Sequence, residues 1–195
     1  MITLDATMVP PFMTTSAPDA PAAAALDCSD RTAVHRLYQR LGRAVVHRVR
    51  RVVRRDDVAQ EILQETFVRL WTAGPLFTSE SSAFTWVYKT SHRLALDHLR
   101  SRFSNSAFVD NETLATLAGV PGTQEDEAVQ QQLLHRVIGR LGDDEASFFV
   151  LKVVDQMTLE EIGTFAGVSS KTVSRVLARV DRKIAQFRGA QQHEF

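Results

Sequence analysis

The stretch TLEEIGTFAGVSSKTVSRVLARVDR (residues 158–182) predicts two helices joined by a tight turn. Thr158 and Glu161 have the Ser/Thr-x-x-Glu spacing of a capping box, so we expect a helix to begin there. Gly167 suits the left-handed conformation that commonly ends a helix, and Ser169 or Ser170 can cap the next one. Two helices across a short glycine-containing turn form a helix-turn-helix, whose second helix suits a DNA major groove.

The second of these helices has one apolar face and one basic face. The inward positions recur at helical spacing and are Val173, Val176, Leu177 and Val180. The other face carries Lys171, Ser174, Arg175, Ala178, Arg179 and Arg182. Small, polar and basic side chains of this kind can contact the bases and phosphates of a major groove. The alternative is an ordinary helical hairpin with a solvated basic face.

Charge is balanced over the whole chain but unevenly distributed along it. The 195 residues include 23 Lys+Arg and 23 Asp+Glu, so the zero net charge alone gives no reason to expect nucleic acid. Arginines crowd residues 31–55, where acidic residues four positions away are almost missing. We expect this arginine stripe to be unpaired within the chain and to face a polyanion or an acidic protein.

The amino-terminal residues predict a tail rather than a folded element. Residues 1–29 hold four prolines among Ala, Ser, Thr and Asp, so we expect disorder and an exposed, inactive thiol at Cys28. This single cysteine excludes an internal disulfide and a Cys-x-x-Cys metal site. Neither a secretory signal nor an apolar run of roughly 20 residues is present, which predicts a cytoplasmic protein without membrane insertion.

The rest of the chain predicts only helices, so the expected fold class is all-α. One helix begins at residue 30, and a second runs from residue 56 or 57 to the Gly-Pro pair at 74–75, burying Phe67 and Trp71. A third begins at Ser81 or Ser82, after a polar loop, and runs to about residue 102. We expect residues 103–126 to form a flexible linker between two small helical domains, residues 30–102 and residues 127–188, and the chain to fray after residue 186.

The third expected helix carries an aromatic and basic stripe. Trp86, Lys89, Arg93 and Arg100 recur at steps of three, four and seven. An aromatic ring that stacks on a base, with cations that follow the phosphates, suits a single nucleic-acid strand. Alternatively, Trp86 and Tyr88 are half-buried packing residues, and this helix alone does not decide between the two.

Three stretches in order resemble the bacterial RNA polymerase sigma factors of the extracytoplasmic-function type. DVAQEILQETFVRLW (residues 57–71) looks like their core-binding helix. FTSESSAFTWVYKTSHRLALDHLRSR (residues 77–102) looks like their promoter-melting loop and following helix. LGDDEASFFVLKVVDQMTLEEIGTFAGVSSKTVSRVLARV (residues 141–180) looks like their carboxy-terminal promoter-binding domain. The order and spacing of all three are far more specific than a helix-turn-helix alone.

The resemblance implies a role for each stretch. The implied polymerase-binding residues are Asp57, Gln60, Glu61, Gln64 and Glu65. The implied residues for the melted minus-ten element are Phe77, Ser79, Trp86, Lys89, Arg93 and Arg100. The implied residues for the minus-thirty-five element are Ser170, Lys171, Thr172, Ser174, Arg175, Arg179 and Arg182. Core RNA polymerase, promoter DNA and an inhibitory anti-sigma factor are the implied partners, with no cofactor, no metal and no enzymatic activity.

The chain departs from the family pattern in three places. The family commonly has Asn where this chain has Arg93, which puts upstream contacts there in doubt. Arg175 stands one place earlier than the usual arginine of the recognition helix, a rotation of about 100° around the helix axis, so the preferred minus-thirty-five sequence is also in doubt. The tail before residue 27 is outside the pattern.

Two other functional classes remain as alternatives. A free-standing helix-turn-helix regulator would bind duplex DNA tightly without polymerase, as a dimer on a palindrome. A helical enzyme is disfavoured because there is no phosphate-binding glycine loop, nucleophile elbow or H-E-x-x-H motif. The histidines within the expected helices are scattered rather than placed at metal-ligand spacing: His35, His47, His92, His98 and His135.

Overall fold

The computed structural model describes residues 26–73, 76–106, 134 and 136–191, and this part of the chain is almost entirely helical. The helices are α1 (Arg31–Val53), α2 (Asp56–Ala73), α3 (Glu80–Ser106), α5 (Asp143–Val153), α6 (Leu159–Ala166) and α7 (Ser170–Gln191), with a further helical segment at residues 136–140. Two short strands, β1 (Leu26–Asp27) and β2 (Leu76–Phe77), pair antiparallel. The all-α prediction is confirmed, and the strand pair is its one small exception.

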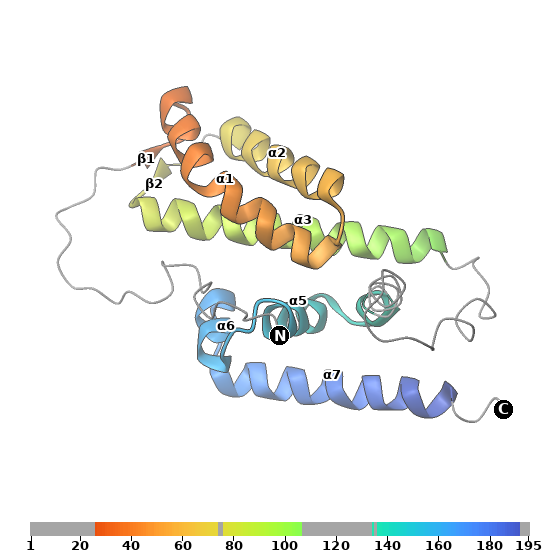
Figure 1. The fold of residues 1–195 in the computed structure, drawn as a ribbon. Coiled ribbons are helices and arrows are strands. Elements are labelled where there is room, and N and C mark those ends of the chain that lie inside the picture. The colour runs from red at the N-terminus through yellow and green to blue at the C-terminus, as the bar shows by residue number, and fades with distance from the viewer. Residues whose placement is uncertain (1–25, 74–75, 107–133, 135, 192–195) are drawn as a thin grey trace, which may run out of the picture.

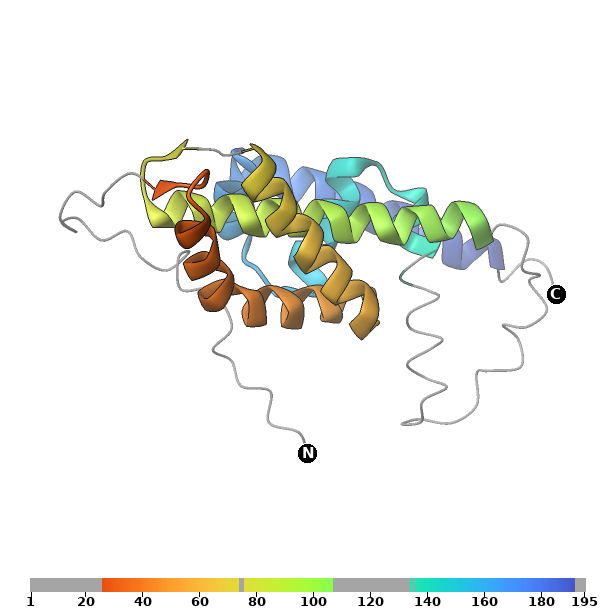
Figure 2. The same ribbon diagram turned by 90° about the horizontal axis from the view of Figure 1, so that it is seen from above.

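The amino-terminal half is a three-helix arrangement in which α1 and α2 lie across α3 (Figures 1 and 2). Asp30 caps α1, because its carboxylate accepts a hydrogen bond from the Thr32 N–H at 2.9 Å. Leu37, Val49 and Leu70 are among the fully buried side chains between these helices. Burial of this apolar surface is the main stabilising contribution to the bundle.

The carboxy-terminal half is built from α5, α6 and α7, and it packs directly on the first half. In Figure 1, α5 and α6 lie between α3 above and α7 below, and α5 contacts both α3 and α7. Ile138, Leu141 and Val150 belong to the same apolar cluster as the side chains between α1, α2 and α3. The sequence predicted two modules joined by a linker, but it did not predict that they share a packed surface.

The structure differs from the sequence-based expectation at the start of the fold. Leu26 pairs with Phe77, and Asp27 pairs with Leu76. Cys28 belongs to the apolar cluster between α1, α2 and α3 and is completely buried. The prediction of an exposed thiol in a tail is therefore wrong. The strand pair brings this segment onto the bundle, and no local signal in the sequence indicated it. Residues 1–25 of the expected tail lie outside the described residues.

Helix ends also differ from expectation. Helix α3 begins at Glu80 rather than after Ser81 or Ser82, since the Ser79 hydroxyl accepts the Ser82 N–H at 3.2 Å. The same helix continues to Ser106, past the expected boundary at residue 102, and α7 continues to Gln191, so the expected fraying after residue 186 is wrong. The expected linker lies mostly outside the described residues.

The prediction of an unpaired arginine stripe is wrong for several of its members. Arg40 pairs with Glu80, Arg50 with Asp56, Arg55 with Asp57 and Arg48 with Asp155. None of these partners lies three or four residues from its arginine, so acidic residues at helical spacing did not indicate any of them. Of the helices that the structure describes, none combines the length and apolar character needed to cross a bilayer.

Candidate nucleic-acid interface

Hydrogen bonds at the helix ends determine the geometry of the helix-turn-helix. The Thr158 hydroxyl accepts the Glu161 N–H at 3.2 Å, and the Glu161 carboxylate accepts the Thr158 N–H at 2.7 Å. This reciprocal pair confirms the predicted capping box at the start of α6. Gly167 ends α6 with a φ of 74°, a left-handed conformation that glycine adopts without a steric penalty.

A second glycine lets the turn pass close to α6. An added Cβ at Gly163 would lie 2.7 Å from the Val168 carbonyl oxygen, which is closer than real Cβ atoms approach. The Val168 N–H also donates to the Gly163 carbonyl at 2.9 Å. Of the two serines that the sequence left open, Ser169 is the cap, since its hydroxyl accepts the Thr172 N–H at 3.2 Å. Ser170 is the first residue of α7.

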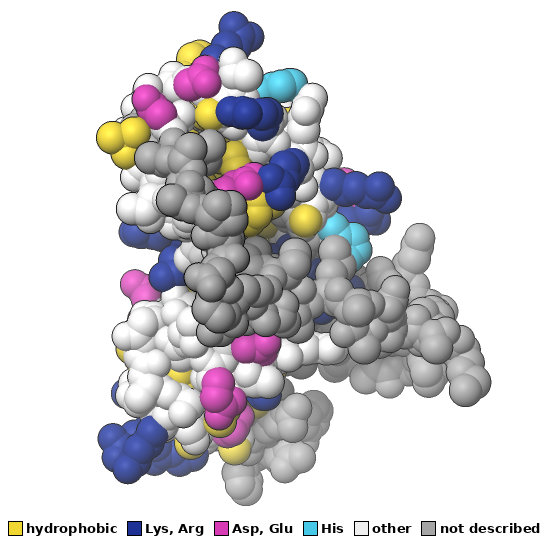
Figure 3. Space-filling view, turned by 90° about the vertical axis from the view of Figure 1, so that its left-hand side faces the viewer, with side chains coloured by type: hydrophobic (Ala, Val, Ile, Leu, Met, Phe, Trp, Pro, Cys, Tyr) yellow, Lys and Arg dark blue, Asp and Glu magenta, His cyan; other side chains and the backbone are white. Residues whose placement is uncertain are grey.

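Helix α7 turns its apolar side inward and its basic side toward solvent. Val173, Val176 and Val180 are buried. The residues proposed to face the minus-thirty-five element are exposed, except for the half-buried Ser170: Lys171, Thr172, Ser174, Arg175, Arg179 and Arg182. Lys and Arg side chains gather at the lower end of the molecule in Figure 3, where α7 begins. This surface has the positive charge that phosphate contacts require.

Glu145 positions part of this basic surface, a role that the sequence analysis missed. Its carboxylate, which is nearly buried, accepts a hydrogen bond from Lys183 at 2.6 Å and lies 3.2 Å from Arg179. It also accepts the Gly142 N–H at 2.9 Å. The Lys183 hydrogen bond, followed by that backbone bond, lowers the pKa of Glu145 below its ordinary value. The sequence signal was its place three residues after Gly142, as in a capping box.

The residues proposed for the minus-ten element lie along β2 and α3. Phe77 and Trp86 are both half-buried and meet edge to face, with ring centroids 6.4 Å apart. Ser79 is half-buried, and its hydroxyl makes the bonds that cap α3. The ring of Trp86 thus has a packing partner while part of it remains accessible, and its role in binding a base stays a prediction.

The cations of the same stripe have different surroundings. Arg93 is exposed. Lys89 is exposed and places its Nζ 5.4 Å from the ring centroid of Phe165, in α6. Arg100 pairs with Asp143, at the start of α5, at 2.6 Å. Two of the three cations therefore contact the carboxy-terminal half.

The residues proposed to bind polymerase form an exposed face on α2. Asp57, Gln60, Glu61, Gln64 and Glu65 are all exposed. Two of them already have arginine neighbours, because Asp57 pairs with Arg55 and Glu65 pairs with Arg69 at 2.6 Å. Hydrogen bonding by Arg55 lowers the pKa of Asp57 below its ordinary value.

Trp71 was predicted to be buried, and this prediction is wrong. Phe67 is buried, but Trp71 is 55% exposed, as is Val68 at 54%. Both residues border a groove between α1 and α2 that Tyr38 also lines, and the Tyr38 ring meets the Phe67 ring edge to face at 5.1 Å. Helical spacing placed Trp71 on the inner face, but at the last turn of α2 the described neighbours leave it partly uncovered.

The three sets of residues lie on separate helices, α2, α3 and α7, and do not converge on one pocket. The described residues hold no group of three or more His, Cys, Asp or Glu side chains that could bind a metal ion. The arrangement thus suits extended contacts with macromolecules better than binding of a small substrate.

Comparison with known proteins agrees with this arrangement. The family described as sigma-70 region 2 matches residues 37–103. The RNA polymerase sigma factor YlaC of Bacillus subtilis is 24% identical over 76% of this chain and 88% of its own length. The sigma factor CarQ of Myxococcus xanthus is 27% identical, with coverages of 61% and 68%. The extracytoplasmic-function sigma factor SigW of Bacillus subtilis is 26% identical, with coverages of 62% and 70%.

The family match covers α2 and most of α1 and α3, and the relatives extend the likeness over most of the chain. The implied order of a core-binding helix, a strand-binding helix and a helix-turn-helix is the order of α2, α3 and α6–α7. The chain is therefore similar over most of its length to RNA polymerase sigma factors, among them members of the extracytoplasmic-function type, and residues 37–103 match sigma-70 region 2.

Proposed function

We propose that this protein binds core RNA polymerase and directs it to specific promoters, without catalytic activity of its own. The exposed basic face of α7, held over a packed apolar face by the helix-turn-helix, is the observation that carries the proposal. In this assignment α2 contacts polymerase, β2 and α3 hold the melted minus-ten element, and α7 reads the minus-thirty-five element. Such a protein works in the cytoplasm, where polymerase and DNA are found.

The polymerase contact is assigned to α2 because its outer face is polar and unobstructed. Gln60, Glu61 and Gln64 are exposed along consecutive turns. The exposed Val68 and Trp71 add apolar surface next to them. A polar face that adjoins exposed apolar side chains is typical of protein-binding surfaces.

The minus-thirty-five contact is assigned to α7 because its first turns combine short polar side chains with arginines. Ser174 and Arg175 are exposed, and the helix is fixed from below by Val173 and Val176. A recognition helix that keeps its orientation without DNA can align side chains with base edges in the major groove.

The minus-ten contact is assigned to β2 and α3. The half-buried rings of Phe77 and Trp86 can receive an unstacked base, and Arg93 is free to contact phosphate. Holding a flipped base stabilises melted DNA, because that base no longer re-pairs. By family resemblance alone, an anti-sigma factor that covers the polymerase-binding surface is a further proposed partner.

Transcription from a library of genomic fragments tests the proposal. The chain is mixed with core polymerase, and transcript start sites are mapped with and without it. We expect start sites that depend on the chain and share two sequence elements. Failure to associate with core polymerase would overturn the proposal, and tight dimeric binding to a palindrome without polymerase would favour the free-standing regulator instead.

Paired variants test the separate surfaces. Gln60→Ala combined with Glu61→Ala should weaken association with core polymerase. Arg175→Ala should leave that association intact and weaken recognition of the mapped promoters by about 1–3 kcal/mol if Arg175 contacts a base. A phosphate contact would instead weaken all sequences alike and lower the salt slope by about one. Glu160→Ala, an exposed change on α6, is the matched control.

A further inference from the structure

Resting on the proposed function, we infer that the packed arrangement of the two halves is a closed, inactive state. The ion pair between Arg48 of α1 and Asp155, just after α5, holds this state closed, and it must open before a promoter is read. We call the group Arg48, Tyr88, His92, Ser147 and Asp155 the Arg48 junction. None of these residues belongs to the proposed polymerase, minus-ten or minus-thirty-five surfaces.

The ion pair at the centre of the Arg48 junction is buried and has several hydrogen bonds. Arg48 Nη2 donates to Asp155 Oδ2 at 2.6 Å, and Arg48 Nε lies 3.2 Å from Oδ1 and 3.1 Å from Oδ2. The two side chains are only 9% and 5% exposed. The residues are 107 positions apart in the chain and lie in different halves. A pair with this geometry fixes how the two halves dock, and removing one partner would leave a buried charge without its counter-charge.

His92 and Tyr88 of α3 complete the Arg48 junction. Arg48 can only donate hydrogen bonds, so His92 Nδ1 accepts from Arg48 Nη2 at 2.8 Å. His92 Nε2 therefore carries the ring proton and donates it to the Ser147 hydroxyl of α5 at 2.9 Å. The Tyr88 hydroxyl donates to Asp155 Oδ2 at 3.3 Å, and the Arg48 guanidinium lies 3.9 Å from the centroid of the Tyr88 ring.

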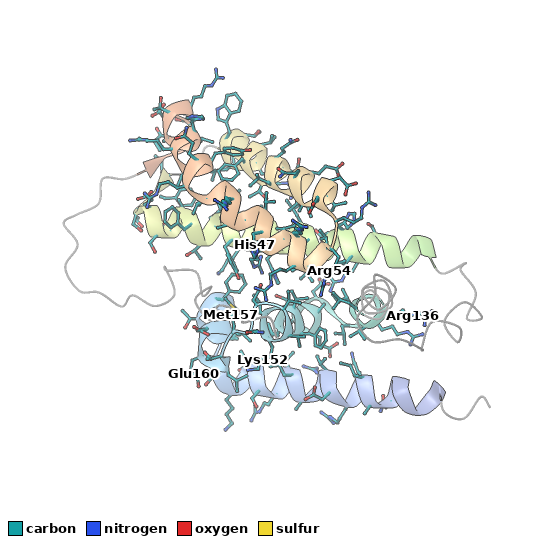
Figure 4. The ribbon with its side chains drawn as sticks, in the orientation of Figure 1. His47, Arg54, Arg136, Lys152, Met157 and Glu160 are labelled. Carbon is teal, nitrogen blue, oxygen red and sulfur yellow. The ribbon has the colours of Figure 1, made fainter. Side chains whose placement is uncertain are left out.

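The turn after α5 places Asp155 in this position. The Asp155 N–H donates to the Val150 carbonyl at 3.2 Å, and Gln156 follows with a φ of 57°. A non-glycine residue in the left-handed region is uncommon and is often retained where a neighbouring side chain must be aimed. Arg51 of α1 donates to the Val154 carbonyl beside it. In Figure 4 the labelled His47 of α1 and Arg54, just after α1, lie in the upper half of the molecule, and Met157 lies below them in the carboxy-terminal half.

The closed arrangement engages residues that the proposed function assigns to the minus-ten element. Lys89 faces the Phe165 ring of α6, and Arg100 is paired with Asp143 of α5. The rings of Tyr88 and His92 also meet Phe165 edge to face, at 5.4 and 5.8 Å. A melted strand that follows α3 would compete with these contacts for the same cations.

The spacing of promoter elements excludes simultaneous reading by the closed form. Elements centred at minus ten and minus thirty-five are about 25 base pairs apart, which is roughly 85 Å along duplex DNA. In the closed form, a single layer of helices, α5 and α6, separates α3 from α7 (Figure 1). Packed helices lie 8–10 Å apart, so about 20 Å separates the two reading helices. The halves must therefore separate by several times their present distance.

The chain length allows this separation. Residues 107–133 connect the two described parts, and a chain of this length spans at most about 90 Å. The contact itself is also suited to reversal. A buried ion pair gains little net free energy over its solvated, separated state, because desolvation offsets the attraction between the charges. Contacts between domains of this mixed polar and apolar kind are typical of domains that move relative to each other.

Small-angle X-ray scattering of the free, full-length chain tests the closed state directly. Asp155→Ala and Arg48→Ala each leave one buried charge without its partner, which should shift the equilibrium toward the open form by about a hundredfold or more. Both variants should show a larger radius of gyration than the parent at unchanged helix content. Asp181→Ala, an exposed change on α7, is the control and should match the parent. An unchanged radius in either Asp155→Ala or Arg48→Ala would overturn the inference.

Transcription from the mapped promoters by a fixed amount of core polymerase supplies the second measurement. Because only the open form can place α3 and α7 on both promoter elements, both variants should reach half-maximal transcription at a concentration at least tenfold lower than the parent. Equal or weaker transcription by folded, expanded variants would overturn the inference that the closed state is inactive. A parent chain and variants that all fail to bind core polymerase would instead overturn the proposed function, and the scattering result would still decide whether the Arg48 junction holds the halves together.

Discussion

Replacing Gly163 by alanine should destabilise the helix-turn-helix by about 1–2 kcal/mol. The added Cβ would lie 2.7 Å from the Val168 oxygen and 3.3 Å from the Ser170 nitrogen. Both are backbone atoms, so neither can rotate away as a side-chain tip could. Overpacking of this kind costs about 1–3 kcal/mol, and the higher helix propensity of alanine returns at most about 1 kcal/mol. The clash should therefore decide the sign.

Urea unfolding of the full chain, followed by far-ultraviolet circular dichroism, measures this change. With a typical slope for a small domain, the midpoint of the transition that includes α6 and α7 should fall by roughly 0.5–1 M. Gly42→Ala in α1 is the matched control. Its added Cβ would be 3.7 Å from the nearest atom of Leu63, an ordinary contact, so we expect stabilisation of about 0.5–1 kcal/mol.

The opposite signs of the two substitutions are the essential result. If Gly163→Ala were as stable as the parent, the turn after α6 would not pass as close to the helix as the structure places it. A stabilising effect equal to that of Gly42→Ala would show that helix propensity alone governs this position.

Three further predictions concern His92 of the Arg48 junction, the N-cap of α6 and the buried thiol of Cys28. Burial, and then the Arg48 charge, holds the pKa of His92 well below its ordinary value of 6.5. As pH drops below about 6.5, His92 therefore binds a proton in the unfolded chain but not in the folded chain. The free energy of unfolding should fall over the same pH range. His92→Gln should flatten this dependence in melting curves recorded from pH 8 to pH 5. Thr158→Ala removes the hydroxyl that accepts the Glu161 N–H, so the free energy of unfolding should fall by about 1 kcal/mol in urea titrations. Burial raises the pKa of the Cys28 thiol, so Ellman's reagent should modify it at least tenfold more slowly in the folded chain than in urea, and rapid labelling of the folded chain would contradict its packing.

Local signals in the sequence determined the elements of the helix-turn-helix. The capping box at Thr158, the left-handed Gly167 and the buried valines of α7 all lie where the pattern predicted them. Capping bonds join residues about three apart, and helical faces repeat every three or four residues, so both are visible in a short window. The exposed face of α2 followed from the same periodicity.

Which faces meet was decided only by the tertiary structure. Arg48 looked like one more solvent-facing arginine, because its partner Asp155 lies in the other half of the chain. Cys28 is buried by a strand pair, and Trp71 is exposed at a helix end, and neither outcome is encoded in helical spacing. Periodicity identifies the side of a helix that is apolar, but the neighbour that covers it, and the charge that pairs across the contact, depend on how the separate elements pack in space.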